Sequence, residues 1–591
     1  MPKFGLPTAL ARGDDPPNPP AVLPRIGWPS LRVAVPRVSL AAIRLWVTWT
    51  ITTATLFLCY IHVASSAVVT SDGASNALQA WDMLHGNLLL HGWRLSDVSF
   101  YTTELPQYLV IERFTGLTPE VVHVASAMTY TLLILLAMMA AKARTTGREA
   151  IARCLLAAGI MAAPQAGNGV YVLLGSPDHV GSTVPVLLAF LLLDRAPRRW
   201  YTVAGAGSLL GLALIADGIA MYTGVLPVVI VCGARIYQAR IAAAQRWRTV
   251  IFDLALGAAA LCAVWLSSLT LAAVRSGGGF MVWPVPRALA APADVPHYLI
   301  TTARGLLLLF GANFFSHNAG LVAFLAAARL IGFGLAAWAV CAVIRRFGSA
   351  DLAAQLLAAG AVVVLAAYAL GTRAGGLLTA RDLAAVLPFG AALAGRLLPS
   401  RLAPARLLPA MGVLLACYLF SLGRIVTLPP AQAANGDLAA WLAEHHLTYG
   451  LAGYWNANIT TLDTGGKVVL RSVLADGSHI AGDYWEVKSS WYNPKLNDAN
   501  FIVLVPGPPG FKRYPTVGSV RATFGQPRQI YFIGEYTVVV YDKNLLAELV
   551  PGAPLPPRTT QNGPPAIPLP GPLWPPSSYR RRARARRLLR D

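Results

Sequence analysis

An aspartate closely follows a long apolar segment of this sequence. Residues 43–70 carry one charged side chain, Arg44, and Asp72 stands two residues beyond that segment with no lysine or arginine beside it. A carboxylate in such a place can accept a proton from a hydroxyl group within hydrogen-bond reach. It can equally cap a following helix by accepting hydrogen bonds from free backbone N–H groups. The two roles are compatible, and the sequence leaves both open.

Two further carboxylates interrupt apolar sequence. Asp178 and His179 lie in "GSPDHVGST" (175–183), and Asp217 lies in "LIADGIAM" (214–221). His179 could bind phosphate or a metal, but no third ligand for a zinc site is evident. The alternative for this pair is a polar turn. Asp217 at membrane depth would face a cavity or a partner, whereas Gly218 beside it also fits a plain turn between two spans.

The elements that must position these residues are membrane helices. The chain of 591 residues is 55% hydrophobic and only 13% charged, with a mean hydropathy of +0.53. Apolar stretches near bilayer length recur along it, which is typical of an α-helical polytopic membrane protein. We expect about eleven transmembrane helices, at 43–69, 120–141, 150–165, 182–194, 201–216, 218–234, 250–274, 319–344, 351–371, 383–398 and 406–426.

The arginines indicate how these helices are oriented. Basic residues gather in alternate connections, which the positive-inside rule assigns to the cytoplasm. These connections contain Arg25, Arg32, Arg37, Arg44, Lys142, Arg144, Arg148, Arg153, Arg195, Arg198, Arg199, Arg235, Arg240, Arg246, Arg248, Arg345, Arg346, Arg396, Arg401 and Arg406. We therefore expect a multi-pass protein of the cell membrane with a cytoplasmic N-terminus and an extracytoplasmic C-terminal domain. Most of the net charge of +21 then reflects topology rather than a nucleic-acid partner.

The composition divides the chain into four parts. Residues 1–42 form a cytoplasmic segment rich in proline and arginine, and 43–426 form the transmembrane domain, with an outer loop at 70–119. Residues 427–550 are predicted to be a small extracytoplasmic α/β domain, with a helix at 437–446 and strands at 467–473, 501–505, 529–533 and 536–542. Turn signals stand at 465–466 and 507–510. Residues 551–591 read as a disordered tail, first proline-rich and then arginine-rich.

The first outer loop has the pattern of a helix. Ala77, Trp81, Leu84 and Leu88 are spaced by four, three and four residues, as on one face of a helix. Asp72, Asn76 and Gln79 fall on another face. The pattern predicts an amphipathic helix on the membrane surface that turns its polar face toward a cavity. A second such element is predicted over 105–114, and the apolar stretch 297–313, which contains Arg304, is predicted to be re-entrant or interfacial.

The order of these features resembles one enzyme superfamily. An aspartate after the first span, then interfacial helices, many spans and an outer C-terminal domain look like the GT-C superfamily of polyprenyl-phosphate-sugar-dependent glycosyltransferases. "SDGASNALQAWDMLHGNLLLHGW" (71–93) with "FYTTELPQY" (100–108) is similar to actinobacterial members of that group. Many members carry two adjacent acidic residues in this loop. Here Asp72 is followed by Gly73, which puts a metal site in doubt.

The resemblance implies a reaction and a set of roles. The donor would be a sugar on a polyprenyl phosphate, and the acceptor an extracytoplasmic glycan, lipid or protein. Asp72 would be the general base, and Asp178 would join it from the second outer loop. The lipid phosphate would be held by arginines on the outer side. The candidate substrate-binding residues are Arg381, Arg373, Arg304, His179, Glu104 and Asn76, while Arg381 could instead pair with Asp382. No cofactor is certain, although a divalent metal could take part.

Two other function classes compete with a transferase. A transporter or lipid flippase would show paired half-helices or similar sequence halves, and the sequence has neither. Its polar residues would reach the middle of the membrane, whereas those of an enzyme would cluster on one outer face. A non-catalytic scaffold that binds cell-wall glycan through the outer domain would tolerate loss of Asp72 but not of that domain.

Overall fold

The computed structural model describes residues 40–241, 247–284, 288–316, 320–397, 408–506 and 513–549. By its contacts the chain divides into two units, Met1–Ile51 and Thr52–Asp591. Only the start of helix α1 is described in the first unit, and apart from the bounds of that helix everything below concerns the second. The predicted tail at 551–591, the predicted turn at 507–510 and most of the predicted segment 1–42 lie outside the described residues.

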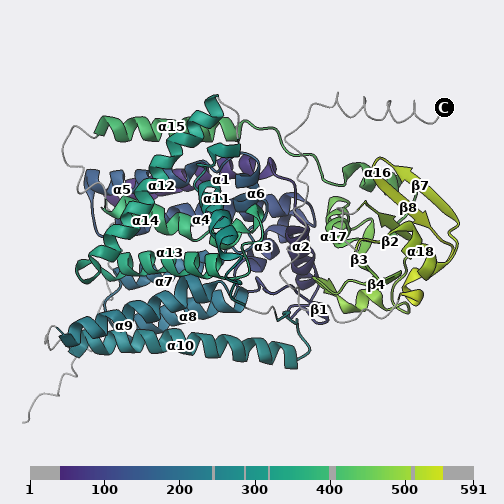
Figure 1. Ribbon diagram of the computed structural model, residues 1–591, viewed down its shortest axis with the longest axis horizontal. Helices are drawn as coiled ribbons and strands as arrows, with labels where there is room; N and C mark the ends of the chain where they lie inside the picture. Colours follow the sequence, from purple (N-terminus) through teal and green to yellow (C-terminus); the bar gives the residue numbers. More distant parts are fainter. Residues whose placement is uncertain are drawn as a thin grey trace, which may run out of the picture. The chain divides into compact units, whose positions relative to one another are not determined.

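The region up to residue 426 is almost entirely helical. Figure 1 shows α7, α8, α9 and α10 in one group, in which α8 contacts α7 and α10, and α9 contacts α10. The elements are α1 (Leu40–Ser65), α2 (Ser71–Leu84), α3 (Leu105–Thr115), α4 (Glu120–Lys142), α5 (Gly147–Ala162), α6 (Asn168–Leu174), α7 (Thr183–Arg195), α8 (Trp200–Ala216), η1 (Met221–Val225), α9 (Leu226–Ile241), α10 (Trp247–Ser276), α11 (Val295–Leu309), η2 (Phe314–Ser316), α12 (Leu321–Arg345), η3 (Phe347–Ser349), α13 (Leu352–Leu370), η4 (Leu377–Leu383), α14 (Val386–Leu397) and α15 (Leu408–Val426).

Among the described residues, seven helices are long and apolar enough to cross a membrane. They are Trp46–Ser65, Glu120–Lys142, Met221–Arg240, Trp247–Ser276, Leu321–Arg345, Leu352–Leu370 and Pro409–Val426. The pair η4 and α14, bent by 54°, makes an eighth if it is one span. The spans predicted at 150–165, 182–194 and 201–216 are the helices α5, α7 and α8, of 16, 13 and 17 residues. A polytopic helical protein is confirmed, but the count of eleven spans is not.

The C-terminal region is an α/β domain, as predicted. Its sheet has the strand order β4-β3-β2-β6-β8-β7, in which β2 runs parallel to β3 and β6 while the other pairs are antiparallel. The strands are β2 (Tyr449–Ala452), β3 (Val469–Asp476), β4 (His479–Gly482), β6 (Phe501–Leu504), β7 (Gln529–Ile533) and β8 (Tyr536–Val540), and the helical elements are α16 (Gly436–Glu444), α17 (Tyr454–Asp463), η6 (Ser489–Tyr492), α18 (Val517–Phe524) and η7 (Leu545–Glu548).

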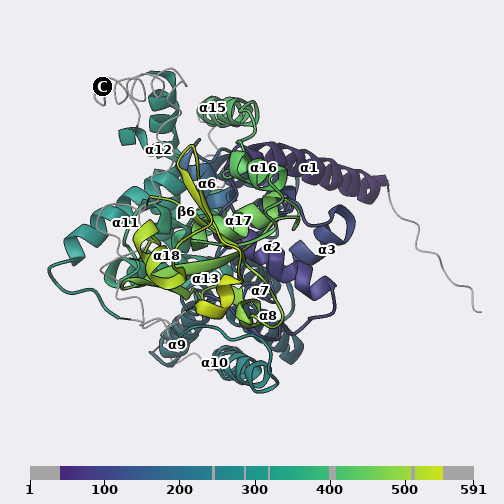
Figure 2. The same cartoon turned by 90° about the vertical axis from the view of Figure 1, so that its right-hand side faces the viewer.

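Both faces of this sheet are covered by helices. Alternate residues of a strand point to opposite faces. On one face Leu451 and Ile502 pack with Phe524 of α18. On the other, Phe501 packs with Leu438 of α16 and with α17 (Figure 2). The sheet is thus the middle of three layers, which explains why β6 reads as a continuous apolar run.

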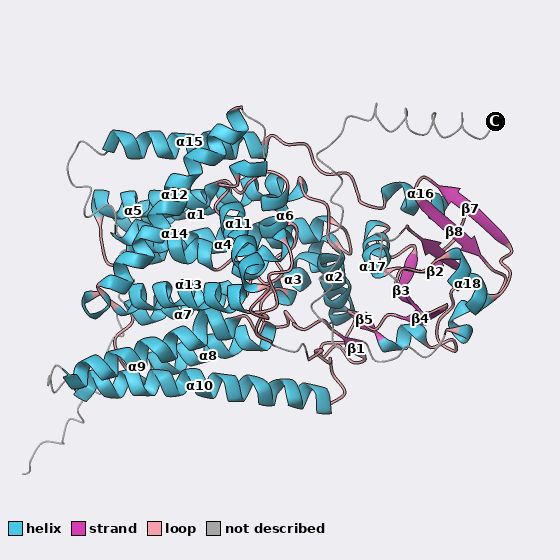
Figure 3. Cartoon of the chain, in the orientation of Figure 1, coloured by secondary structure: helices cyan, strands magenta, loops and turns pink. Residues whose placement is uncertain are grey.

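A short strand pair joins the first outer loop to this domain. Strand β1 (Trp93–Arg94) runs antiparallel to β5 (Val487–Lys488). Figure 3 shows this pair apart from the larger sheet. In addition, α17 packs against α2. The outer loop and the C-terminal domain therefore form one packed structure around α2, and this junction is where the predicted site residues lie.

Candidate functional site

Helix α2 presents Asp72 in its first turn. The N-cap is Thr70, whose hydroxyl accepts a hydrogen bond from the backbone N–H of Gly73 at 2.9 Å. The alternative that Asp72 caps this helix is therefore wrong, because Thr70 already satisfies that N–H group. Asp72 is instead free to contact other side chains, and the positive end of the helix dipole favours its negative charge. Leu88, predicted on the apolar face, lies beyond the end of α2 at Leu84.

Close packing around position 73 explains why a glycine, rather than a second acidic residue, follows Asp72. A Cβ at position 73 would meet Val122 Cγ1 at 2.9 Å and the Cβ of Ser176 at 3.1 Å. Contacts that short would force the neighbouring helix or the loop at 176 to shift. The close packing of α2 at this point leaves no room for a side chain at residue 73.

The carboxylate of Asp72 is held by groups from two distant parts of the chain. Arg381 in η4 places Nη2 3.0 Å from Oδ2, and the hydroxyl of Tyr454 in α17 donates to Oδ1 at 2.8 Å. The Asp72 side chain keeps 16% of its surface exposed, and that of Arg381 keeps 31%. The described ion pair joins Arg381 to Asp72 rather than to Asp382. Both groups of the pair can therefore still be reached by a ligand.

Asp178 lies beside this pair, fully buried. Its Oδ1 accepts from Asn76 Nδ2 at 2.7 Å, and its Oδ2 accepts from Ser176 Oγ at 2.5 Å. Burial, and then the negative charge of Asp72, raise the pKa of Asp178 to about 6 although Arg381 opposes them. The structure thus brings together four of the predicted site residues, Asp72, Asp178, Arg381 and Asn76.

The cluster contains a third carboxyl group that the sequence did not indicate. Glu486 lies in the loop before β5, and its Oε2 is in hydrogen-bond contact with the hydroxyl of Tyr454. That hydroxyl carries one proton, so it cannot donate to both Asp72 and Glu486. Burial, and then the charge of Asp72, raise the pKa of Glu486 well above its usual range. A protonated Glu486 can donate to Tyr454, which then donates to Asp72.

The backbone around these contacts is fixed by further hydrogen bonds and by strain. Ser71 Oγ donates to the carbonyl oxygen of Tyr454 at 2.6 Å, and Ser75 Oγ donates to that of Glu486 at 3.4 Å. Glu486 has φ +52° and His179 has φ +64°, values that are strained for residues with a side chain. Such strain gathers at functional sites more often than elsewhere, because the surrounding contacts must maintain it.

His179 contacts a carboxylate rather than open space. Its Nδ1 lies 2.8 Å from Asp217 Oδ2, and both side chains are buried. Burial alone would lower the pKa of His179, but the charge and hydrogen bond of Asp217 outweigh it and raise that pKa to about 9. Asp217 therefore pairs with His179 and is also the C-cap residue of α8. His179 is oriented by this pair.

Glu104 is also buried close to this pair. Thr103 Oγ1 donates to its Oε2, while its Oε1 has no partner among the described residues. Burial raises the pKa of Glu104 well above its usual range, and the nearby charges of Asp217 and Asp178 add to the effect. Burial thus favours the neutral form of this carboxyl group, which packs against the backbone at Gly181.

The other two predicted arginines differ from Arg381. Arg373 forms an ion pair with Asp97, and its side chain is 50% exposed. Arg304 is exposed on α11 and has no hydrogen bond or ion pair within the described residues. Among those residues, no group of three or more histidine, cysteine or acidic side chains is arranged to hold a metal.

No protein-family model matches the chain, and no curated protein matches it in sequence. Its structure is similar to that of ArnT from Cupriavidus metallidurans bound to undecaprenyl phosphate, with 13% identity, a TM-score of 0.49, and coverage of 85% of this chain and 99% of that one. It is also similar to AglB, the oligosaccharyltransferase of Archaeoglobus fulgidus, in complex with an inhibitory peptide and a dolichol-phosphate. That likeness has 14% identity and a TM-score of 0.41, and covers 78% of this chain and 69% of that one. At these values neither likeness decides what this chain does.

Proposed function

We propose that this protein is a membrane glycosyltransferase that moves a sugar from a polyprenyl-phosphate donor to an acceptor hydroxyl outside the membrane. The observation that carries the proposal is the pair of Asp72 and Arg381, a carboxylate and a guanidinium 3.0 Å apart and both still partly exposed. They lie just beyond a helix long and apolar enough to cross a membrane. A base and an anion-binding group side by side are what transfer from a lipid phosphate requires.

Asp72 is suited to take the proton of the acceptor. The acceptor oxygen attacks the anomeric carbon of the donor sugar as the bond between that carbon and the phosphate oxygen breaks. The bonding electron pair leaves with the phosphate, and the hydroxyl proton passes to the Asp72 carboxylate. The hydrogen bonds from Arg381 and Tyr454 hold that carboxylate in one orientation.

Arg381 is suited to hold the phosphate that leaves. Within the described residues its one hydrogen bond is to Asp72, so the other N–H groups of its guanidinium remain for a second anion. A guanidinium can bind two phosphate oxygens at once. It would also stabilise the negative charge that grows on the phosphate as the sugar departs.

The raised pKa values make room for that phosphate. Three ionised carboxylates beside Arg381 would give the cluster a net charge of about −2 and repel an anionic donor. The raised pKa values of Glu486 and Asp178 favour their neutral forms and so reduce this excess. Of the three, Asp72 is the carboxylate whose charge the reaction needs.

The donor class comes from the motif resemblance of residues 71–93 and 100–108. ArnT was solved with undecaprenyl phosphate and AglB with a dolichol-phosphate, and both lipids belong to the class proposed here. The arginines support the proposed side of the membrane. Arg153, Arg195 and Arg396 lie on elements that meet at the far ends of α4, α7 and α14, which we take as cytoplasmic. The cluster around Asp72 is then extracytoplasmic.

The test is transfer by purified protein in detergent or nanodiscs. A panel of polyprenyl-phosphate monosaccharides is supplied with cell-envelope glycan, and release of free polyprenyl phosphate is followed. Asp72→Asn should lower the rate by roughly 10²- to 10⁴-fold, the usual contribution of a general base. Glu120→Gln changes an exposed carboxylate at the start of α4 and should transfer normally.

The fold of each variant is checked by its thermal unfolding midpoint. Near-normal transfer by Asp72→Asn would exclude Asp72 as the base. A wild-type protein that consumes no donor of the panel, yet binds envelope glycan, would instead favour the scaffold alternative.

A further inference from the structure

A pocket lies between α2 and the C-terminal domain, farther along α2 than the Asp72 cluster. It has a volume of about 320 Å³. Its lining includes Trp81 and Asp82 of α2, Trp93 of β1, Arg471 of β3 and Trp491 of η6. None of the residues that contact Asp72 or Asp178 lines it. Trp81 is nine residues after Asp72, which places it about 14 Å along the helix from the proposed base.

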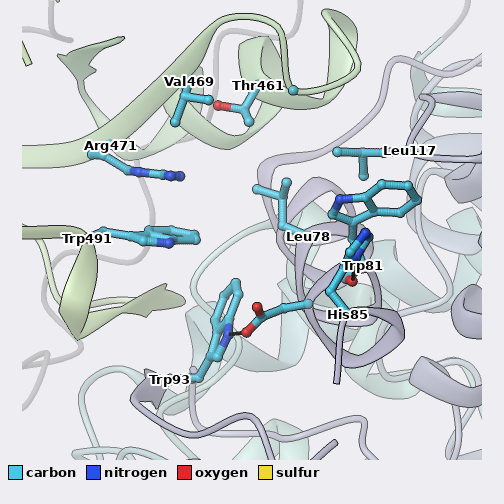
Figure 4. A pocket seen from close by; sticks show the side chains of 11 residues that line it. Leu78, Trp81, His85, Trp93, Leu117, Thr461, Val469, Arg471 and Trp491 are labelled. Atoms are coloured by element: carbon cyan, nitrogen blue, oxygen red, sulfur yellow. Dashed lines mark hydrogen bonds between the residues drawn. The ribbon is translucent and has the colours of Figure 1, made fainter. Parts of the chain in front are cut away.

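The walls of this pocket are rich in indole rings. Trp93 and Trp491 meet edge to face with centroids 5.0 Å apart, and Trp81 packs against His85 at 4.5 Å. Figure 4 shows Arg471 and Trp491 pointing from the C-terminal domain toward Leu78 and Trp81 of α2. The half-buried ring of Trp81 thus offers an apolar surface to a ligand between the two walls. Such a surface suits the C–H face of a sugar ring.

The two charged residues of the pocket differ in whether they are paired. Asp82 is already engaged, since its carboxylate accepts from Trp93 Nε1 at 2.7 Å and lies 3.1 Å from Lys488 Nζ. The guanidinium of Arg471 lies over the ring of Trp491 at 3.9 Å and has no hydrogen bond or ion pair within the described part of the chain. Burial lowers the pKa of Arg471 to about 10, so it remains charged at neutral pH. The pocket therefore presents an unpaired cation.

We propose that this pocket binds an acidic saccharide, a sugar chain carrying a carboxylate or phosphate group. The acidic group pairs with the guanidinium of Arg471, which Trp491 holds in place by a cation–π contact. A sugar ring of the chain packs against Trp81. Because Trp81 is about 14 Å along α2 from Asp72, a chain of several sugars can lie in the pocket while its end reaches the base. Naming this saccharide the acceptor rests on the proposed function, whereas its binding does not.

Binding is tested with the full chain in the Asp72→Asn background, so that no transfer consumes the ligand. The probe is a glycan array with neutral oligosaccharides, the same backbones bearing uronic acids, and backbones bearing phosphate. Acidic members should bind and their neutral counterparts should not. Free glucuronate and inorganic phosphate, used as competitors, show which of the two acidic groups is preferred.

Substitutions then locate the binding. Arg471→Gln should weaken binding of acidic members by at least tenfold, Arg471→Lys should recover part of it, and Trp81→Ala should weaken it too. The matched controls are Arg521→Gln, an exposed arginine of the same domain, and Trp441→Ala, a half-buried tryptophan outside the pocket. Both should bind as the parent does, and unfolding midpoints verify that every variant is folded.

The inference is overturned if no acidic saccharide binds, if neutral members bind equally, or if Arg471→Gln binds as the parent does. Its failure is distinct from failure of the proposed function. Binding that depends on Arg471 in a protein without transfer would leave the pocket as a glycan site. Transfer without such binding would refute saccharide binding in the pocket but would support the proposed glycosyltransferase activity.

Discussion

Two charged clusters stand at opposite ends of the helical region, and they are built differently. At one end Arg396 pairs with Asp194 at 2.8 Å and Asp351 at 2.9 Å, and donates to the carbonyl oxygen of Ala140 at 2.8 Å. Its side chain is only 6% exposed. The cation is saturated by partners from three helices, which is what a group that joins helices needs.

At the other end the acidic groups exceed the cation. Asp72 and Asp178 lie close to Arg381, whose side chain is 31% exposed, and Glu486 joins them through the hydroxyl of Tyr454. Burying more carboxyl groups than there are cations to pair with them is unfavourable for stability. A carboxyl group without a cation must stay protonated in the folded protein, although in water it would ionise. A protein keeps such an arrangement where function requires it. The comparison therefore separates a structural cluster from a candidate reaction site by how completely each charge is paired.

The largest effects should come from replacing Arg381 and Arg396, the arginine at the centre of each cluster. Arg381→Met should lower transfer by roughly 10²- to 10³-fold, as expected for a group that stabilises leaving-group charge. The protein should remain folded, since Asp72 is partly exposed and water can solvate it. Rates with the lipid-linked donor and unfolding midpoints measure both effects.

Arg396→Met is the matched change at the other end. It leaves two carboxylates without their cation, one of them buried, and should lower the free energy of unfolding by roughly 3–5 kcal/mol. Normal stability for Arg396→Met, or an unfolded Arg381→Met, would reverse the assignment of the two clusters.

The second prediction concerns pH. The folded protein keeps the proton of Asp178 up to about pH 6, whereas an unfolded aspartate loses it near pH 4. The native state therefore binds more protons in this range, and stability falls as the pH rises through it. Asp178→Asn cannot ionise and can keep contacts with Asn76 and Ser176. It should raise the free energy of unfolding at pH 7.5 by up to roughly 3 kcal/mol, and by little at pH 4.

Asp194→Asn serves as the comparison, because it removes charge from the saturated cluster and should lower stability at pH 7.5. Unfolding midpoints of both variants across pH 4–8 decide the matter. A pH-independent gain for Asp178→Asn would contradict the buried, proton-holding carboxyl group.

Tyr454→Phe should have a smaller effect. It removes the hydroxyl that lies between Asp72 and Glu486, so the base loses one of its two donors. A hydrogen bond to a charged group is worth roughly 1.5–3 kcal/mol, so transfer should fall roughly 10- to 100-fold. Tyr492→Phe, which loses hydroxyl bonds to Ser472 and Asp483, should lower stability and leave the rate unchanged. Equal rates for Tyr454→Phe and wild type would remove this residue from the site.

Arg373→Gln should change least. Its ion pair with Asp97 involves a side chain that is half exposed, and such pairs contribute roughly 0–1 kcal/mol. Stability should hardly move, and transfer should fall less than in Arg381→Met. A loss as large as that of Arg381→Met would show that the phosphate is shared between both arginines, and Arg304→Gln tests the remaining candidate in the same assay.

The sequence could indicate Asp72, Asp178 and Arg381 because each interrupts apolar sequence at the predicted outer ends of helices. It could not indicate the bond from Tyr454 to Asp72, because the two residues are 382 positions apart and meet only through the packing of α17 against α2. Glu486 contacts Tyr454 and joins the site only through that packing, so the sequence could not indicate it either. The sequence left the cap of α2 open for a local reason. Threonine, serine and aspartate at 70–72 can all cap a helix, and only the extended backbone of Thr70 selects it.

The β1–β5 pair and the hydrogen bond from Tyr454 have a consequence for recombination between homologous genes. The C-terminal domain supplies Tyr454 and Glu486 to a cluster whose other members belong to the helical region, and it supplies Arg471 and Trp491 to the pocket beside α2. The two regions therefore cannot be exchanged independently between homologous genes. A recombination point near residue 430 would join a foreign domain to an α2 that it does not match, so functional chimeras require α2 and the C-terminal domain from the same parent.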